Sequence, residues 1–132
     1  EGHVDAEIND QYRSSGGALR FLQNILQYPG CGRFFARASF LAREPDGRLA
    51  GMCLASLIGP RAGHLTQVCV HPKWKGKGLG RDLVEASLSA LAQEGCDRVT
   101  LTVTSSNEAA VRLYQSFGFR VVRKFPALVW NF

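Results

Sequence analysis

The stretch from Val68 to Arg81 constrains the fold of this chain more than any other. It reads VCVHPKWKGKGLGR: an apolar, β-branched run enters a loop with three glycines, and helical spacing of apolar residues begins at Leu79. Glycine lets a backbone come close to a ligand, and the first amides of a helix lack partners and attract anions. The same stretch carries the cations Lys73, Lys75, Lys77 and Arg81. The order of strand, glycine loop and helix predicts an anion site at a helix start.

Patterns elsewhere predict an α/β (α+β) fold with a mixed, mostly antiparallel twisted sheet and helices on both faces. We expect strands at residues 34–43, 49–58, 64–70, 99–104, 119–124 and 127–130. Two helical segments are expected within residues 1–30, a third from Leu79 to Gly95, and a fourth that a capping box of Ser105 and Glu108 opens and Gly118 closes. A turn with Pro and Gly at residues 44–48 joins the first two strands.

Length and composition narrow the class of protein. At 132 residues the chain fits one domain, and its apolar runs are too short for a membrane helix. The four cysteines are scattered without zinc spacing, which favours reduced thiols, a cytoplasmic location and no metal. The net charge of +5 suggests an anionic partner. Because the sequence lacks a helix-turn-helix, zinc-finger or RNP-like pattern, we expect neither nucleic acid nor membrane as that partner.

Other glycine-rich sites fit the loop less well. A Walker phosphate loop and a dinucleotide fingerprint both need glycine spacings that this chain lacks. Without a ligand, the stretch would be a glycine-rich connector with solvated lysines.

Two motifs resemble signatures of the GCN5-related N-acetyltransferases (GNAT). Lys75-x-x-Gly78-x-Gly80 is similar to that family's acyl-CoA pyrophosphate loop, with Lys in place of Gln or Arg. The run Asn107-x-x-Ala110-x-x-Leu113-Tyr114-x-x-x-Gly118-Phe119 resembles its second signature. The resemblance covers roughly residue 34 to the C-terminus. It implies one GNAT domain over residues 1–132, with a helical substrate-side region at 1–30, no evident first strand and a splayed central pair of parallel strands.

The resemblance also implies an acetyl-CoA site. The pantetheine arm would pair with backbone along the strand at Val68, Cys69 and Val70, and Asn107 would orient the arm from the next strand's end. The implied cofactor-binding residues of the loop and second signature are Lys75, Gly76, Lys77, Gly78, Leu79, Gly80, Arg81, Asn107, Ala110 and Tyr114.

Catalytic roles follow from the same resemblance. An amine acceptor would attack the thioester directly, and the Tyr114 hydroxyl would protonate the leaving thiolate. Some relatives place a basic Glu eleven residues before the loop's first position, which is His64 here; others place it at the position of Thr102, which cannot serve. His64 is our candidate base, and Glu7, Asp10 or no base at all remain alternatives.

The resulting function is transfer of an acetyl group from acetyl-CoA to a primary amine. The acceptor is a small molecule or a peptide, and the protein is a monomer or homodimer. The alternative is an acetyl-CoA-binding sensor or interaction domain without activity.

Overall fold

The computed structural model describes residues 19, 23, 32–126 and 128 of the chain. The helices expected within residues 1–30 therefore lie outside the described residues, apart from single helical positions at Leu19 and Gln23. The described strands are β1 (Arg33–Phe34), β2 (Phe40–Arg43), β3 (Leu49–Gly59), β4 (Ala62–Val70) and β5 (Arg98–Leu101). The described helices are α3 (Leu79–Gln93), α4 (Glu108–Ser116) and the 3-10 turns η1 (Ala36–Ala38) and η2 (Pro72–Trp74).

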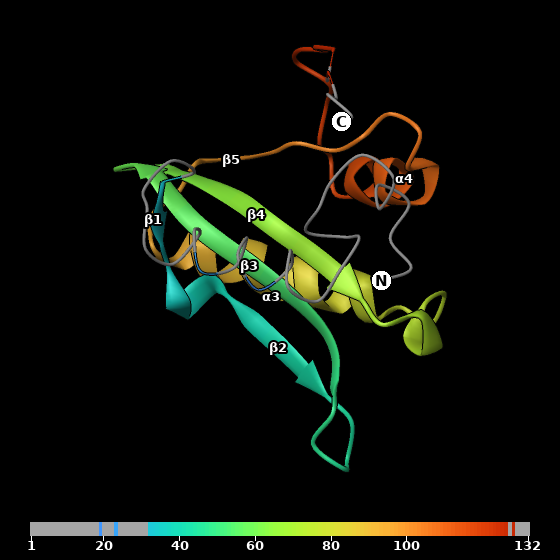
Figure 1. The fold of residues 1–132 in the computed structure, drawn as a ribbon. Helices are drawn as coiled ribbons and strands as arrows, with labels where there is room; N and C mark the ends of the chain where they lie inside the picture. The colour runs from blue at the N-terminus through green and yellow to red at the C-terminus, as the bar shows by residue number, and fades with distance from the viewer. Residues whose placement is uncertain (1–18, 20–22, 24–31, 127, 129–132) are drawn as a thin grey trace.

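The five strands form one mixed sheet, as the sequence predicts (Figure 1). Its order is β1-β3-β4-β5, and β2 pairs with β3 on the same side as β1. All pairs are antiparallel except β4 with β5, which run parallel from Ala62 opposite Arg98 to Leu65 opposite Leu101. β4 continues to Val70 after this pairing ends, so the parallel pair is joined at one end and splayed at the other.

The first predicted strand is interrupted in the middle. Residues expected to run unbroken from 34 to 43 form β1 and β2 with η1 between them. The Ser39 hydroxyl accepts from the Ala55 amide at 2.9 Å and donates to the Phe35 carbonyl at 2.9 Å. A side chain thus replaces the missing ladder bond, because a buried strand amide is costly to leave unpaired.

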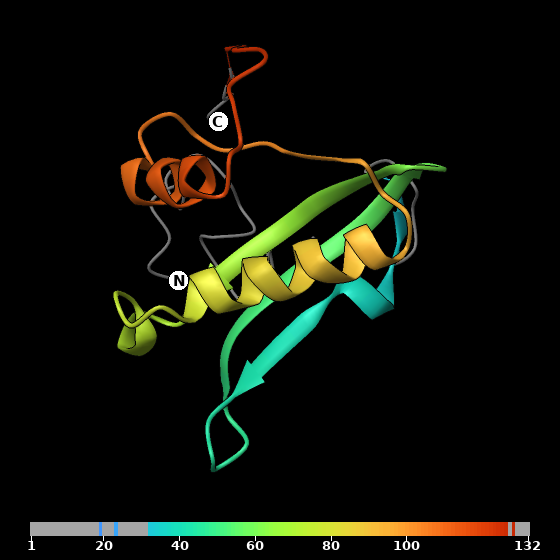
Figure 2. The same ribbon diagram turned by 180° about the vertical axis from the view of Figure 1, so that it is seen from behind.

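Helix α3 covers one face of the sheet, across β3 and β4 (Figure 2). Its apolar stripe buries Leu83, Val84 and Leu91 against strand residues that include Ala55 and Leu65. The helix lies so close that a Cβ built on Gly63 would meet the Leu91 side chain at 2.9 Å. Glycine at this strand position therefore permits the close approach of helix and sheet.

Helix α4 begins two residues later than its predicted capping box allows. Its N-cap is Asn107, whose Oδ1 accepts from the Ala110 amide at 3.3 Å, and Glu108 is the first helical residue. The prediction of Ser105 as the cap is therefore wrong. Asn is at least as good an N-cap as Ser, and Asn107 occupies the boundary from which the helix runs.

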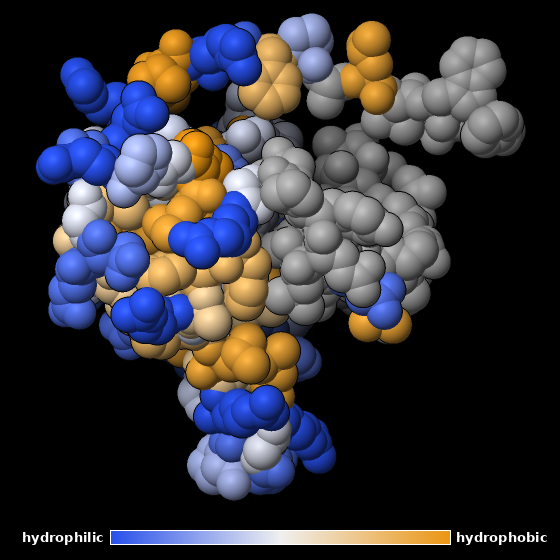
Figure 3. All heavy atoms as spheres, turned by 90° about the vertical axis from the view of Figure 1, so that its left-hand side faces the viewer, coloured by the Kyte–Doolittle hydropathy of each residue, from blue (hydrophilic) through white to orange (hydrophobic). Residues whose placement is uncertain are grey.

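The strand predicted at residues 119–124 does not form. After α4 the segment runs away from the sheet in Figure 1, an arm of atoms projects from the body of the molecule in Figure 3, and Val122 is 91% exposed. Val121 and Val122 are adjacent, so in a strand they would point to opposite faces and break the alternation of a half-buried strand. The strand predicted at 127–130 lies outside the described residues except for Leu128, which is 94% exposed.

Two larger features are absent from the residues that the structure describes. No helix among them is long and apolar enough to cross a membrane. Within the same residues, His, Cys, Asp and Glu side chains do not gather in a group of three or more that could hold a metal ion.

Candidate functional site

The glycine loop between η2 and α3 forms the centre of the site. Gly76 and Gly78 have φ of +75° and +84°, in the left-handed region that L-residues rarely adopt, and Gly78 is the N-cap of α3. Leu79, Gly80 and Arg81 are the first residues of α3, so their amides have no acceptor in a preceding helical turn, and Asp82 is the first whose amide bonds back, to the Gly78 carbonyl at 3.1 Å. These amides, with the positive end of the α3 dipole, suit an anion such as a phosphate.

Gly80 differs from the other two glycines of the loop. Its φ is not left-handed, and an added Cβ would lie 3.6 Å from Val70 and 3.7 Å from Leu113, which is ordinary contact. The fold itself would accept an alanine here. An acidic side chain here would stand beside the first amides of α3, where it would compete with an anionic ligand.

The cations of the loop are held in specific places. Lys77 Nζ lies 5.2 Å from the ring centre of Trp74, and Lys73 Nζ lies 5.9 Å from the same ring. Arg81 donates to the Ser116 hydroxyl at 2.7 Å and lies 5.0 Å over the ring of Phe117. Arg81 thereby ties the start of α3 to the end of α4, beside the glycine loop.

Beyond its pairing with β5, β4 presents backbone N–H and C=O groups along the same edge. In an antiparallel ladder, residues whose N–H and C=O groups face the partner alternate with residues whose groups face away. The His71 amide donates to the Ala50 carbonyl of β3 at 2.8 Å, so Cys69 faces β3, and the backbone groups of Val68 and Val70 face the other side. Val68 and Val70 are thus placed to pair with an extended ligand, whereas the backbone of Cys69 belongs to the β3 ladder.

The second signature places its residues where the splayed side of β4 ends. Leu113 and Tyr114 pack against the core, and Tyr114 makes an edge-to-face contact with Phe119 at 5.9 Å. Asn107 uses its Oδ1 for the helix cap, which leaves its side-chain amide as a donor group of the kind that an acyl arm can use. Leu79 also packs against the core, so its amide, not its side chain, is its contribution to the loop.

His64 lies at the joined end of the parallel pair. Its Nδ1 is 2.8 Å from the Thr100 hydroxyl, its register partner, one pair before the last pair of the ladder. Burial lowers the pKa of the His64 imidazole below its ordinary value, so the neutral, proton-accepting form dominates at neutral pH. Thr102 is exposed and follows the end of β5.

The thiols near the site are not activated. Cys53, Cys69 and Cys96 are free, and burial raises the pKa of the Cys53 thiol to about 11 and that of the Cys69 thiol above its ordinary value. A raised pKa disfavours the thiolate, which is the nucleophilic form. These residues suit packing, as expected from their apolar sequence context.

Sequence reasoning missed two residues at the start of the loop. Glu44 was assigned only to a turn, and Trp74 received no role, yet their side chains are hydrogen-bonded across 30 positions of sequence. A carboxylate in a turn carries no local signal of a distant partner. The one available hint is that the sequence holds a dense cationic segment with few acids nearby.

Comparisons with known proteins agree with this geometry. The model of the Acetyltransferase (GNAT) family matches residues 6–119. The mycothiol acetyltransferase of Kocuria rhizophila is 47% identical over 125 residues, which are 89% of this chain and 40% of that protein. The mycothiol acetyltransferase of Acidimicrobium ferrooxidans is 38% identical over 102 residues, which are 74% of this chain and 33% of that protein. The crystal structure of Ard1 from Thermoplasma volcanium superimposes with a TM-score of 0.67 at 19% identity, over 85% of this chain and 68% of that one.

The splayed parallel strands, the glycine loop at the start of α3 and the matching family model together show that this chain belongs to the GNAT acetyltransferase family. It spans between a third and two-fifths of the length of these two mycothiol acetyltransferases.

Proposed function

We propose that this chain binds acetyl-CoA and transfers the acetyl group to a primary amine by direct attack, without a covalent enzyme intermediate. One observation carries the proposal: the first amides of α3, which have no acceptor in a preceding helical turn, and the outward-facing backbone of Val68 and Val70 lie close together along one chain segment. An anion site followed by a free strand edge matches a ligand with a pyrophosphate and an amide-containing arm.

The loop and β4 supply binding in this proposal. The loop amides and cations hold the phosphates, and the Val68 and Val70 backbone pairs with the arm like an added strand. When bound, acetyl-CoA supplies the activated thioester. The amide of Val68 or Val70 is the donor for the carbonyl oxygen, which gains negative charge during attack.

Two side chains take part in proton transfer, one as a base and one as an acid. His64, neutral because burial lowers its pKa, accepts a proton from the amine directly or through a water. The hydrogen bond of Nδ1–H to the Thr100 oxygen would leave Nε2 as the accepting atom. The Tyr114 hydroxyl gives a proton to the leaving sulfur. A C–N bond forms, the C–S bond breaks, and an amide and free CoA result.

The acceptor is a small-molecule amine in our first proposal, because the relatives are named mycothiol acetyltransferases. A peptide N-terminus and a lysine side chain are the acceptors to compare with it.

The test measures binding and turnover separately. Isothermal titration should show saturable binding of acetyl-CoA, and mass spectrometry should show an acetylated product for an amine in a panel of small amines, lysine and peptides. Absence of acetyl-CoA binding overturns the proposal as a whole. Binding without turnover across the panel overturns the enzymatic half and supports a binding domain.

A further inference from the structure

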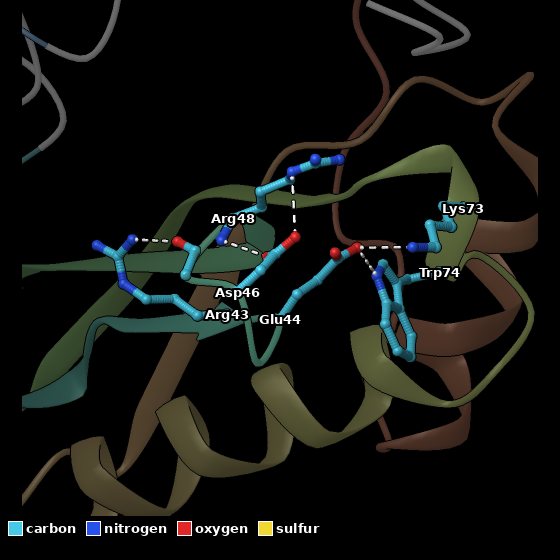
Figure 4. Close-up of polar contacts among 7 residues, drawn as sticks. Arg43, Glu44, Asp46, Arg48, Lys73 and Trp74 are labelled. Atoms are coloured by element: carbon cyan, nitrogen blue, oxygen red, sulfur yellow. Dashed lines mark hydrogen bonds and ion pairs between the residues drawn. The ribbon is translucent and has the colours of Figure 1, made fainter.

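The turn between β2 and β3 touches the start of the glycine loop through one side chain. Glu44 Oε1 accepts a hydrogen bond from Trp74 Nε1 at 2.6 Å and lies 3.4 Å from Lys73 Nζ (Figure 4). Glu44 closes the β2–β3 hairpin, and the other two residues belong to η2, so the contact joins two segments that are separate in sequence.

On the Glu44 side, the contact is largely buried and involves a charged carboxylate. The Glu44 side chain is only 10% exposed, whereas Lys73 is 61% exposed. The Trp74 hydrogen bond is the main cause that holds the pKa of the Glu44 carboxyl below its ordinary value, with Lys73 and then Arg48 contributing. Glu44 is therefore ionised at neutral pH, and hydrogen bonds to an ionised acceptor are about twice as strong as neutral ones.

Trp74 in turn organises the loop that follows. The ammonium groups of Lys73 and Lys77 lie over the indole ring of Trp74. The Trp74 backbone amide donates to the His71 carbonyl at 2.8 Å. The next residues include two glycines with left-handed φ. Such a segment has much conformational freedom, and a loop fixed before binding loses less entropy when a ligand arrives.

The two ends of the loop are therefore anchored by different parts of the fold. Trp74 is held to the β2–β3 turn by Glu44, and Arg81 is held to α4 through Ser116 and Phe117. The anchor at Arg81 uses two unspecified positions within the run of the second signature, Ser116 and Phe117. The anchor at Trp74 lies outside both signatures.

We propose that Glu44 is a positioning residue for the acetyl-CoA loop: by holding Trp74 and Lys73, it fixes the loop in its binding shape. This inference rests on the proposed acetyl-CoA site. It assigns Glu44 no contact with substrate, so its effect falls on affinity for acetyl-CoA and not on the chemical step.

The experiment measures acetyl-CoA affinity and steady-state kinetics for Glu44→Ala and Glu44→Gln in the full chain. We expect Glu44→Ala to raise the Kd and KM for acetyl-CoA about tenfold, because a hydrogen bond to a charged group is lost, while kcat at saturation stays within about twofold. Glu44→Gln retains an acceptor oxygen without the charge and should restore part of the affinity.

Asp46→Ala is the matched control. Asp46 lies in the same turn, where it pairs with the exposed Arg48 at 3.2 Å. It should change neither KM nor kcat appreciably. A Trp74→Phe variant, which lacks the indole N–H, should lose affinity as Glu44→Ala does, and the double variant should be little worse than either.

Three results would overturn the inference. They are an unchanged affinity in Glu44→Ala, an equal loss in Asp46→Ala, or a fall in kcat without a change in KM. Circular dichroism of each variant shows whether the hairpin has unfolded. If it has unfolded in Glu44→Ala, Glu44→Gln is the variant that tests the inference. If the wild type binds no acetyl-CoA, the proposed function itself has failed, which is a distinct outcome.

Discussion

The two edges of β4 differ in how much of their backbone is paired with a neighbouring strand. Along one edge, β4 pairs with β3 from Ala62 to Val70, with register shifts between Leu54 and Ala55 and between Leu57 and Gly59 of β3. Along the other, it pairs with β5 over four residue pairs, and beyond Leu65 no other described strand pairs with this edge. The same strand is thus a structural element on its β3 side and an open backbone edge on its β5 side.

This difference separates stability from binding within one short segment. The β3 edge and the face under α3 contain buried residues whose loss would weaken the fold. The β5 edge presents the outward-facing backbone of Val68 and Val70, and the glycine loop leads into the first amides of α3, and these are groups that a ligand could satisfy. Substitutions on the two sides should therefore produce different measurable defects.

The largest effect on binding is expected at Gly80. Gly80→Glu places a carboxylate at the start of α3, beside the proposed phosphate site, and like charges a few ångströms apart cost several kcal/mol, so we expect the Kd to rise by roughly a hundredfold or more. Gly80→Ala should bind nearly as wild type, because its Cβ meets only ordinary contacts. Titration calorimetry with acetyl-CoA checks both. Equal binding by Gly80→Glu and wild type would remove the loop from the binding site.

The matching change on the structural side is Leu91→Ala. Leu91 is fully buried against Gly63 at the far end of α3 from the loop. Its truncation should lower the free energy of unfolding by about 2–5 kcal/mol, measured in urea. The folded fraction should retain wild-type affinity for acetyl-CoA. A large loss of affinity in the folded protein would show that the two sides of β4 are not separable.

A smaller effect, on turnover alone, is expected at His64. Its pKa is lowered by burial, so wild-type kcat should rise with pH through a value below 6.5 and then level, as the imidazole loses its proton. His64→Ala should lower kcat about a hundredfold and abolish this acid limb. Thr100→Val, which removes the 2.8 Å partner, should shift the limb. An unaltered kcat in His64→Ala between pH 6 and 9 would end its assignment as a base.

The smallest effect is expected at Lys73. Its ammonium pairs with Glu44 and is largely exposed, and exposed pairs contribute about 0.2–1 kcal/mol. Lys73→Ala should therefore raise the Kd for acetyl-CoA no more than about threefold to fivefold. A loss as large as that of Gly80→Glu would mean that Lys73 contacts the phosphates directly.

Much of the fold was predictable because its signals are local. Pro45 and Gly47 place the hairpin turn, the apolar spacing after Leu79 defines α3, and Gly118 ends α4 with a φ of +94°. The mixed, mostly antiparallel sheet follows from the order of these elements. The predicted capping box failed because two competing caps, Ser105 and Asn107, lie two residues apart and local pattern alone does not rank them.

The rest depends on contacts between distant segments. The predicted strand after Phe119 had suitable residue types, but a strand also needs a partner edge, which its sequence does not specify. The loop was found because its glycines and cations are contiguous. The contact between Glu44 and Trp74 was missed because nothing local links the two residues: the first lies in a turn and the second among the lysines of the loop.

The hydrogen bond between Glu44 and Trp74 has a consequence for protein engineering. A chimera that received only residues 72–81 would acquire the glycines and cations but not the carboxylate that holds Trp74. An engineer who moves this loop into another member of the family should transplant the β2–β3 turn with it, as one unit made of two discontinuous pieces of sequence.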